Sequence, residues 1–429
     1  MTPSASPPAS RPASPSASVL RLASPPGETR RARDVRLIGV VASAHFLSHF
    51  FQLSLPPLFP VLKEALGVPY LALGALLTVF YTASGVGQAV AGFVVDRVGA
   101  RPVLLGGLSL LAGAIALAGL APGYAALVPI LALAGIGNSV FHPADYSLLN
   151  ARVSPRWLGR AYSAHSIAGN LGWVAAPAVV IPLSAWLGWR AALATVGLGG
   201  LVAALVLASR PTLRAPSAEA PAAASARVFA WSRDAGLLLA PPIVLAFAYF
   251  TLLSGAFSAV QTFSVSALVS LFGVPLASAS SALTAFLVGN CAGILVGGVL
   301  ADRATRHDLV AAGGLWAASA LVFLLASGAP TALWLAPLMA AAGFSMGATQ
   351  PSRDTLVRGV TPRGASGKVF GFVYSGLDMG SLLMPPVYGW LLDRGEPRGI
   401  FLVATGLLVL TSLTVIEVRR RAVLAPARS

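Results

Sequence analysis

The sequence predicts an all-α membrane protein with twelve transmembrane helices in two pseudo-symmetric six-helix bundles. Of its 429 residues, 56% are apolar and only 10% are charged, whereas soluble domains carry about 25% charged residues. Long apolar runs recur along most of the chain, and a short charged motif that ends one of them returns in the second half. The composition excludes an ordinary water-soluble fold, and the repeated motif indicates two homologous halves.

The apolar runs are long enough to cross a bilayer, which takes about 20 residues per helix. Six of them precede a polar stretch in the middle of the chain, at roughly 36–61, 70–95, 102–121, 124–150, 158–186 and 189–209. Six more follow it, at roughly 236–268, 278–301, 308–328, 331–357, 366–392 and 398–418. They are numbered here as spans 1 to 12.

The segments outside the spans are polar and of simple composition. Residues 1–34 are mainly Pro, Ser, Ala and Arg, which bury too little apolar surface to fold, so they are predicted to form a disordered cytoplasmic tail. Residues 210–235 have a similar composition and are predicted to be a flexible cytoplasmic linker. This organisation leaves an N-terminal six-helix bundle at 35–209, a C-terminal six-helix bundle at 236–418 and a cytoplasmic tail at 419–429.

The basic residues predict the orientation in the membrane. Most arginines lie before span 1, after spans 2, 4, 8 and 10, in the linker or at the C-terminus. The opposite side carries only Lys63, Arg190, Arg394 and Arg398. Because cytoplasmic loops are enriched in Lys and Arg, both termini are predicted to be cytoplasmic. This distribution accounts for the net charge of +15, so nucleic acid is not an expected partner.

The repeated motif is a charged hairpin that follows spans 2 and 8. Its first copy reads Gly92-Phe-Val-Val-Asp96-Arg97-Val-Gly99-Ala-Arg101, and its second reads Gly298-Val-Leu-Ala-Asp302-Arg303-Ala-Thr-Arg306. Spans 4 and 10 also match, through His142-Pro143-Ala-Asp145 and Gln350-Pro351-Ser-Arg353-Asp354. Matched residues lie 205 to 209 positions apart, as expected for a duplicated unit.

The hairpin resembles the signature loop between spans 2 and 3 of the major facilitator superfamily. The first copy has every motif residue in register, whereas the second has Thr305 where the motif has its second glycine. Within this superfamily, Ser48-His49 in span 1 and Ser139-Val-Phe-His142-Pro143 in span 4 resemble the fosmidomycin-resistance branch of efflux carriers.

The resemblance implies a carrier that alternates between inward-open and outward-open states. Spans 1, 4, 7 and 10 would line a central cavity, with spans 2, 5, 8 and 11 along the interface between halves. Asp96 would sit against the N-terminus of span 11, near Ser366, where the helix dipole favours a carboxylate. The two hairpins would then govern conformational exchange. The alternative is a stop signal that only fixes topology.

Ionisable side chains inside the membrane are candidates for function because they are costly there. His45 and His49 are four residues apart on one face of span 1, and His142 lies in span 4. Histidine changes its charge near neutral pH, so these three are candidates for proton coupling or for hydrogen bonding to a substrate. The alternative is a neutral imidazole bonded to a backbone carbonyl, which is the prediction for His165 in span 5.

Three carboxylates also fall within the spans. Asp378 lies about halfway along span 11, and it is predicted to carry the coupled proton, to pair with a cationic substrate or to hydrogen-bond across the interface. Asp145 and Asp354 lie nearer the cytoplasmic side and are predicted to pair with arginines such as Arg152, Arg353 or Arg358 as an inner gate. Further candidates for substrate contact, or else for polar contact between helices, are Asn138, Gln261 and Gln350.

Span 5 contains Gly169-Asn-Leu-Gly172-Trp-Val-Ala-Ala176-Pro177. This run resembles a degraded form of the glycine–proline motif of antiporters in the superfamily, with Ala176 in place of the glycine before proline. Small residues allow helices to pack closely, and proline bends them.

These residues and the resemblance together imply a secondary active transporter in the bacterial inner membrane. The predicted function is proton-coupled efflux of a small organic molecule, as a drug/proton antiporter. A proton-coupled importer of an organic anion is the alternative, favoured if the histidines and Arg353 make the cavity positive, and a transport-silent membrane sensor is a third possibility. The expected partners are the small-molecule substrate, protons and the lipid bilayer, with the chain acting as a monomer.

No catalytic residue, cofactor or metal site is predicted. The chain lacks a glycine-rich phosphate-binding loop ending in Lys-Ser or Lys-Thr, which excludes an ATP-driven pump of that kind. No serine has an evident base and orienting partner. Histidines of span 1 with a third elsewhere are a possible ligand set, but no nearby carboxylate on span 1 completes it, and the single cysteine is Cys291.

Overall fold

The computed structural model describes residues 29–214, 236–360 and 366–424. The helices of the first range are α1 (Arg30–Gln52), η1 (Pro56–Leu58), α2 (Phe59–Leu66), α3 (Tyr70–Val98), α4 (Ala100–Leu120), α5 (Tyr124–Asn138), α6 (Phe141–Arg152), η2 (Pro155–Trp157), α7 (Leu158–Leu187), α8 (Trp189–Ser209) and α9 (Pro211–Arg214). Those of the other two ranges are α11 (Pro241–Phe272), α12 (Leu276–Arg303), α13 (His307–Ala326), α14 (Ala332–Val360), α15 (Ser366–Asp393) and α16 (Pro397–Leu424).

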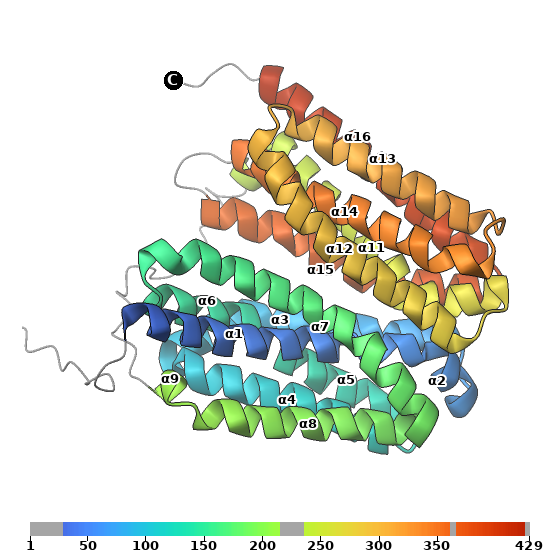
Figure 1. The fold of residues 1–429 in the computed structure, drawn as a ribbon, viewed down its shortest axis with the longest axis horizontal. Coiled ribbons are helices and arrows are strands. Elements are labelled where there is room, and N and C mark those ends of the chain that lie inside the picture. Colours follow the sequence, from blue (N-terminus) through green and yellow to red (C-terminus); the bar gives the residue numbers. More distant parts are fainter. Residues whose placement is uncertain (1–28, 215–235, 361–365, 425–429) are drawn as a thin grey trace, which may run out of the picture.

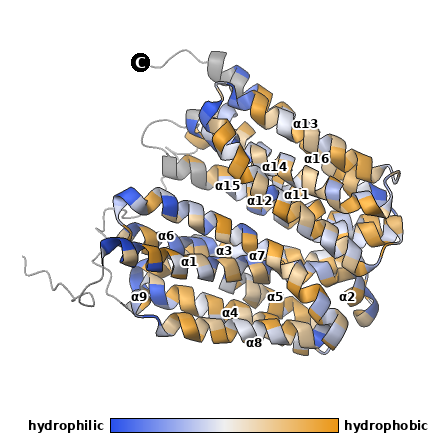
Figure 2. Cartoon of the chain, viewed as in Figure 1, coloured by the Kyte–Doolittle hydropathy of each residue, from blue (hydrophilic) through white to orange (hydrophobic). Residues whose placement is uncertain are grey.

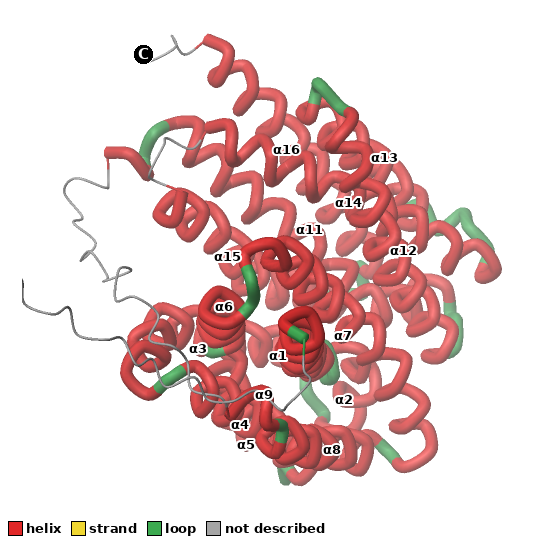
Figure 3. Tube along the Cα trace, turned by 60° about the vertical axis from the view of Figure 1, so that its left-hand side comes forward, coloured by secondary structure: helices red, strands yellow, loops and turns green. Residues whose placement is uncertain are grey.

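Long helices lying side by side make up the molecule (Figure 1), and the described residues contain no strand (Figure 3). With α1 grouped with α2, and α5 with α6, these residues form the six long segments predicted on each side of the linker. Eleven of the segments meet the length and hydropathy expected of a membrane span. The other, α15, is less apolar because it carries Asp378 together with several serines, glycines and prolines. The all-α membrane fold predicted from the sequence is confirmed.

Two spans predicted as single helices are interrupted. Span 1 ends as α1 at Gln52 and resumes as η1 and α2, where Pro56 and Pro57 fix the start of the short 3-10 turn. Span 4 breaks between α5 and α6 at Ser139 and Val140. Pro143 explains this second break, since a proline in a helix removes a hydrogen bond and its ring clashes with the carbonyl four residues earlier.

The ends of the spans also differ from the prediction. Helix α1 begins at Arg30, so residues 30–34 are helical rather than part of a disordered tail. Residues 211–214 of the predicted linker form α9, and the first residues after 418 continue α16. The remaining tail and linker residues, 1–28, 215–235 and 425–429, lie outside the described residues.

Two sets of helices, α1 to α9 and α11 to α16, meet mainly along two pairs of helices. Helix α3 packs against α15, and α7 packs against α12, as expected for spans 2, 11, 5 and 8. The start of α1 and the end of α16 lie on one side of the molecule, where the two sets diverge (Figure 1). This side, which holds the start of α1 and the end of α16, is called the termini side, and polar residues gather there (Figure 2).

Contacts between the two sets are concentrated on the side opposite the termini. Asp393, at the end of α15, accepts hydrogen bonds of 2.8 Å from the backbone N–H groups of Tyr70 and Leu71 at the start of α3. Its Oδ1 also lies 3.4 Å from Lys63 Nζ. Deeper in the molecule, Thr78 donates a 2.8 Å hydrogen bond to the carbonyl of Leu382. These contacts hold the opposite side closed.

Candidate functional site

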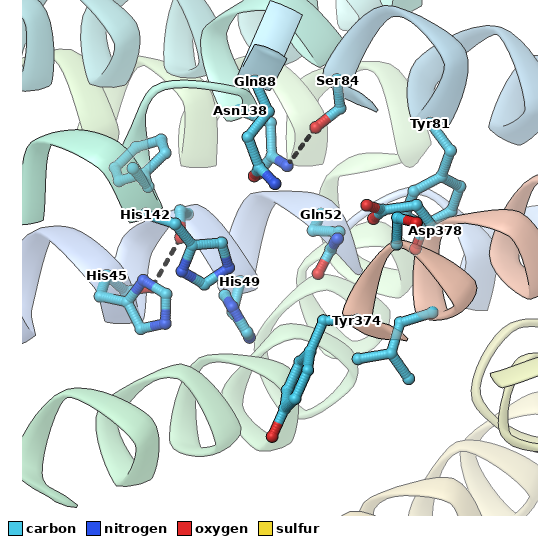
Figure 4. Close-up of a pocket in the computed structure, with 14 residues that line it drawn as sticks. His45, His49, Gln52, Tyr81, Ser84, Gln88, Asn138, His142, Tyr374 and Asp378 are labelled. Carbon is cyan, nitrogen blue, oxygen red and sulfur yellow. Dashed lines mark hydrogen bonds between the residues drawn. The ribbon is translucent and has the colours of Figure 1, made fainter. Parts of the chain in front are cut away.

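A polar cavity of about 250 Å³ lies between the two sets of helices (Figure 4). Helices α1, α3, α5 and α6 form one wall, and α15 forms the other. Its lining residues are His45, Ser48, His49, Gln52, Tyr81, Ser84, Gln88, Asn138, Phe141, His142, Tyr374, Ser375, Leu377 and Asp378. Five candidates from the sequence are therefore brought together: His45, His49, His142, Asn138 and Asp378.

The interruption between α5 and α6 shapes the first wall. It lies between Asn138, the last residue of α5, and His142, near the start of α6. Asn138 donates a 2.9 Å hydrogen bond from its side-chain amide to the hydroxyl of Ser84 on α3. Asn138 and His142 are four residues apart with αR backbone between them, so both side chains face the cavity from adjacent turns.

Four histidine rings form a cluster at the termini-side end of the cavity. The rings of His45 and His165 are stacked with centroids 3.5 Å apart, and the ring of His49 lies 4.5 Å from that of His45. The ring of His142 lies 5.2 Å from His45 and 6.0 Å from His165. His45 and His165 are buried, whereas His142 is exposed to the cavity.

Asp145 on α6 is the carboxylate of this cluster. Its Oδ2 accepts a 3.0 Å hydrogen bond from Nε2 of His165 and lies 3.4 Å from Nδ1 of His45. The predicted pairing of Asp145 with an arginine is therefore wrong. Arg152 lies at the end of α6 and donates a 3.0 Å hydrogen bond to the carbonyl of Thr212. His165 was predicted to hydrogen-bond to a backbone carbonyl, but its partner is the carboxylate of Asp145.

The second set of helices contains a related pair. Asp354 on α14 accepts a 2.8 Å hydrogen bond from Arg353 and a 2.9 Å hydrogen bond from the hydroxyl of Tyr374. Tyr374 follows Asp354 by 20 residues, just as His165 follows Asp145. The pairing of Asp354 with an arginine was predicted correctly. The buried guanidinium of Arg353 also stacks over the ring of Phe250, 4.6 Å from its centroid.

Helix α7 approaches the histidines closely because it presents glycines to α1. A Cβ added at Gly169 would lie 2.9 Å from the His45 ring and 3.0 Å from the His49 ring. A Cβ at Gly172 would meet the backbone carbonyl of Phe46. The glycines singled out in span 5 thus make room for the cluster, and Pro177 lies buried further along the same helix.

Trp173 on α7 was not predicted to be a site residue, but it links His49 to the rest of the cavity. Its ring lies 4.4 Å from the His49 ring, and its Nε1 donates a 2.7 Å hydrogen bond to Gln52. The Phe257 ring of the second set lies 5.8 Å away. The position of Trp173 directly after Gly172 was the feature of the sequence that could have indicated a site residue.

Asp378 faces the cavity from the opposite wall. Figure 4 places its carboxylate beside Tyr81, across the cavity from the histidines. Among the described residues no hydrogen bond or ion pair to Asp378 is found, and the residue is exposed to the cavity. Tyr374, one turn earlier on α15, lines the same wall.

Some expectations about the cavity are not met. Spans 7 and 10 do not line it, and neither Gln261 on α11 nor Gln350 on α14 is among its lining residues. Helix α15 takes their place because it packs against both α3 and α11. Ser254 of α11 donates a 2.6 Å hydrogen bond to the carbonyl of Leu377, which holds α15 between α11 and the cavity. Gln261 is buried and its amide nitrogen has no partner among the described residues.

The first hairpin lies at the termini side, at the junction of α3 and α4. Gly99 has φ +94°, a conformation that favours glycine, and it joins the two helices without an intervening loop. Asp96 and Arg97 are exposed, Gly92 is half-buried, and Arg101 donates a 3.1 Å hydrogen bond to the carbonyl of Ala208. Asp96 was expected to sit against the start of span 11, near Ser366. The side chains at that position lie outside the described residues, so this contact stays a prediction.

The second hairpin joins α12 and α13. Asp302 and Arg303 are exposed and Gly298 is half-buried. Arg306 makes two hydrogen bonds to Asp308, at 2.8 and 3.0 Å. These bonds and the charge of Asp308 raise the pKa of Arg306 above its ordinary value.

The family follows from a sequence comparison. The model of the Major Facilitator Superfamily matches residues 41–271 and 251–428, which together cover both sets of helices. The chain belongs to the Major Facilitator Superfamily. Members of this superfamily are membrane transporters of small molecules rather than enzymes.

Several curated members are similar over part of the chain. The fosmidomycin resistance protein of Escherichia coli K12 is 26% identical over 292 residues, which cover 66% of this chain and 69% of that protein. A probable L-galactonate transporter of the same organism is 25% identical over 186 residues, or 42% of this chain and 41% of that protein. The chloramphenicol resistance protein of Pseudomonas aeruginosa is 35% identical over 154 residues, or 34% of this chain and 35% of that protein.

Solved structures share the fold over nearly their whole length. A bacterial homologue of the human lysosomal transporter Spinster, in an inward-facing and unoccupied conformation, superposes with a TM-score of 0.72 at 16% identity. The match covers 92% of this chain and 99% of that one. A mutant of the nucleoside transporter NupG superposes with a TM-score of 0.72 at 16% identity. That match covers 89% of this chain and 99% of the NupG chain. At such identities the likeness concerns the fold.

Proposed function

We propose that this superfamily member exports a small polar organic molecule from the bacterial cytoplasm in exchange for protons. The proposal rests on one observation above all: Asp378, a carboxylate without a described hydrogen-bond or ion-pair partner, faces a polar cavity between the two sets of helices. The sets correspond to the two six-helix bundles predicted at 35–209 and 236–418, and they would rock about the cavity as rigid halves.

The cavity is the proposed substrate site. Its volume of about 250 Å³ lies just below the roughly 300–1,000 Å³ of pockets for drug-sized ligands. Most of its lining side chains are polar, and they include imidazole, amide, hydroxyl and phenol groups. Such a lining favours a compact molecule that both donates and accepts hydrogen bonds.

Asp378 is the proposed proton carrier. A carboxylate at this depth in a membrane protein is costly unless it has a partner or a proton. Because Asp378 has no hydrogen-bond or ion-pair partner among the described residues, a proton or a substrate is the natural occupant of the space beside it. Alternating occupation by proton and substrate is the basis of antiport.

The proposed orientation gives the cavity access from the cytoplasm, as an exporter needs. Arginines cluster on the termini side, which is therefore proposed to be cytoplasmic. The contacts of Asp393 and Thr78 close the opposite side, so the conformation is proposed to be inward-facing, with the cavity reached from the cytoplasm. Similarity to fosmidomycin and chloramphenicol resistance proteins supports efflux over import.

An importer of organic anions is less well supported. That alternative requires a positive cavity, to which Arg353 was expected to contribute. Arg353 is instead bound to Asp354 at 2.8 Å and is not a lining residue. The similarity to a probable L-galactonate transporter keeps small organic acids among the substrates to be tested.

Purified protein in proteoliposomes provides the test. An imposed pH gradient, acidic inside, would be combined with labelled fosmidomycin, chloramphenicol, lipophilic cations and small organic acids in turn. Antiport predicts that protons leaving the vesicle drive accumulation of one of these compounds inside. Accumulation with the opposite gradient, acidic outside, would indicate symport and contradict the proposal. Uptake at the same rate under either pH gradient would also contradict it.

A further inference from the structure

Three of the clustered histidines are arranged as metal ligands, which the sequence alone did not predict. One ring nitrogen each from His45, His142 and His165 lies within 4.8 Å of the other two. The residues come from α1, α6 and α7, so tertiary packing assembles them. Zn²⁺ held by nitrogen at about 2.0–2.1 Å in a tetrahedron places its ligand atoms roughly 3.3 Å apart. Binding would therefore need side-chain rotations that bring the three nitrogens closer and turn the His45 and His165 rings out of their stacked arrangement.

The electrostatics of the cluster also favour a cation. Asp145 is completely buried, and its Oδ1 has no hydrogen-bond partner among the described residues. Nδ1 of His45 is likewise buried without a hydrogen bond. A buried carboxylate with an unsatisfied oxygen is costly unless a positive charge compensates it. Among the described residues, no arginine or lysine forms an ion pair with Asp145.

Asp145 and His165 supply the usual support for an imidazole ligand. In metal sites, a ligating histidine commonly donates its second ring N–H to a carboxylate, which fixes the tautomer and the ring orientation. Nε2 of His165 is bonded to Asp145 Oδ2 at 3.0 Å. That arrangement leaves the lone pair of the other nitrogen available.

We propose that His45, His142 and His165, supported by Asp145, bind one divalent transition-metal ion, with Zn²⁺ as the preferred occupant. Imidazole ligands suit Zn²⁺, Cu²⁺ and Ni²⁺, and three histidines with one open position are a recurrent Zn²⁺ set. The open position faces the cavity because His142 is exposed there. The bound ion would place a positive charge on the wall opposite Asp378. This binding does not depend on the proposed transport.

Zn²⁺ binding to the purified full-length chain, with any polyhistidine tag removed, provides the test. Titration calorimetry should give one ion per chain. His142→Ala should weaken binding by at least about tenfold, since even changes to supporting residues cost 10–100-fold in metal affinity. The matched control is His307→Ala, which removes a histidine on α13, away from the cluster. No binding to the wild type, a smaller loss in His142→Ala or an equal loss in His307→Ala would overturn the proposal.

A second measurement on the unmodified protein avoids any effect of the substitution on folding. X-ray absorption of the Zn²⁺-loaded chain should show nitrogen neighbours at about 2.0–2.1 Å with the scattering pattern of imidazole rings. A spectrum without imidazole neighbours would contradict the assignment even if the metal binds.

Discussion

Asp145 and Asp378 both lie in spans predicted from the sequence, but their surroundings differ. Asp145 is completely buried and bonded to His165, whereas Asp378 is exposed to the cavity and has no described partner. A buried and bonded carboxylate is suited to holding helices or an ion in place. A carboxylate that faces a cavity can exchange a proton, so Asp378 is the one that the transport cycle would use.

Asp378→Asn should abolish proton-driven transport, because an amide has nearly the same shape but cannot carry a proton. Exchange of labelled for unlabelled substrate across the membrane needs no net proton movement and should persist. Both rates would be measured in proteoliposomes. Glu396→Gln makes the same chemical change at an exposed residue outside the cavity and should behave as wild type. Intact proton-driven flux in Asp378→Asn would remove this residue from the mechanism.

The sequence predicted which polar residues lie in the membrane but not which of them meet. His45 and His49 share a face by spacing alone, and they do line the cavity. The link between Asp145 and His165 could not be foreseen, because it depends on how α6 and α7 pack. The absence of Gln261 and Gln350 from the cavity lining has the same cause, since the position of α15 decides which helices reach the cavity.

At the scale of helices, chain breaks and close contacts shape the site. Pro143 interrupts span 4 between Asn138 and His142, and glycines on α7 allow the α1 histidines to approach. Apolar runs predicted the spans to within several residues. The interruptions were not predicted, because hydropathy averages over a whole run and does not register a local change of backbone direction.

Gly169→Ala should disturb the histidine cluster, because the new methyl group would lie 2.9 Å from the His45 ring. Overpacking of this kind costs about 1–3 kcal/mol. A lower melting temperature in detergent, with impaired transport, is the expected result. Gly85→Ala on α3 is the control, since a Cβ there has no neighbour within 4 Å and alanine favours a helix. Equal melting temperatures and equal transport rates in Gly169→Ala and Gly85→Ala would contradict the packing argument.

Asp393 acts as a latch between α15 and α3. A carboxylate bonded to the free N–H groups at a helix N-terminus is worth up to about 2 kcal/mol, and these bonds must break for the opposite side to open. Asp393→Ala should therefore favour the outward-open state by a factor of roughly 5–30.

Cysteine accessibility can measure that shift. After Cys291→Ser, a reporter introduced by Ser375→Cys in the cavity wall would be labelled from each side of the membrane. Labelling from the cytoplasmic side should fall in Asp393→Ala and remain unchanged in Glu396→Ala, which removes a nearby exposed carboxylate. Unchanged accessibility in both would show that the latch does not bias the conformation.

At the scale of the molecule, the two halves share a hydrogen-bonding pattern but differ in the residues that form it. Each has an aspartate in its fourth span bonded to a residue 20 positions later, but the partner is His165 in one half and Tyr374 in the other. The repeated hairpins revealed the duplication in the sequence. Because of this asymmetry, the histidines of the first half face Asp378 of the second half across one cavity (Figure 4).

Substrate-driven proton movement tests the central claim most directly. Vesicles loaded with a transported compound and a pH-sensitive dye would be diluted into substrate-free buffer at equal pH. Antiport predicts that substrate leaving the vesicle draws protons in, so the interior acidifies in the wild type and not in Asp378→Asn. Efflux of the compound with no change in internal pH, or with alkalinisation, would contradict the account.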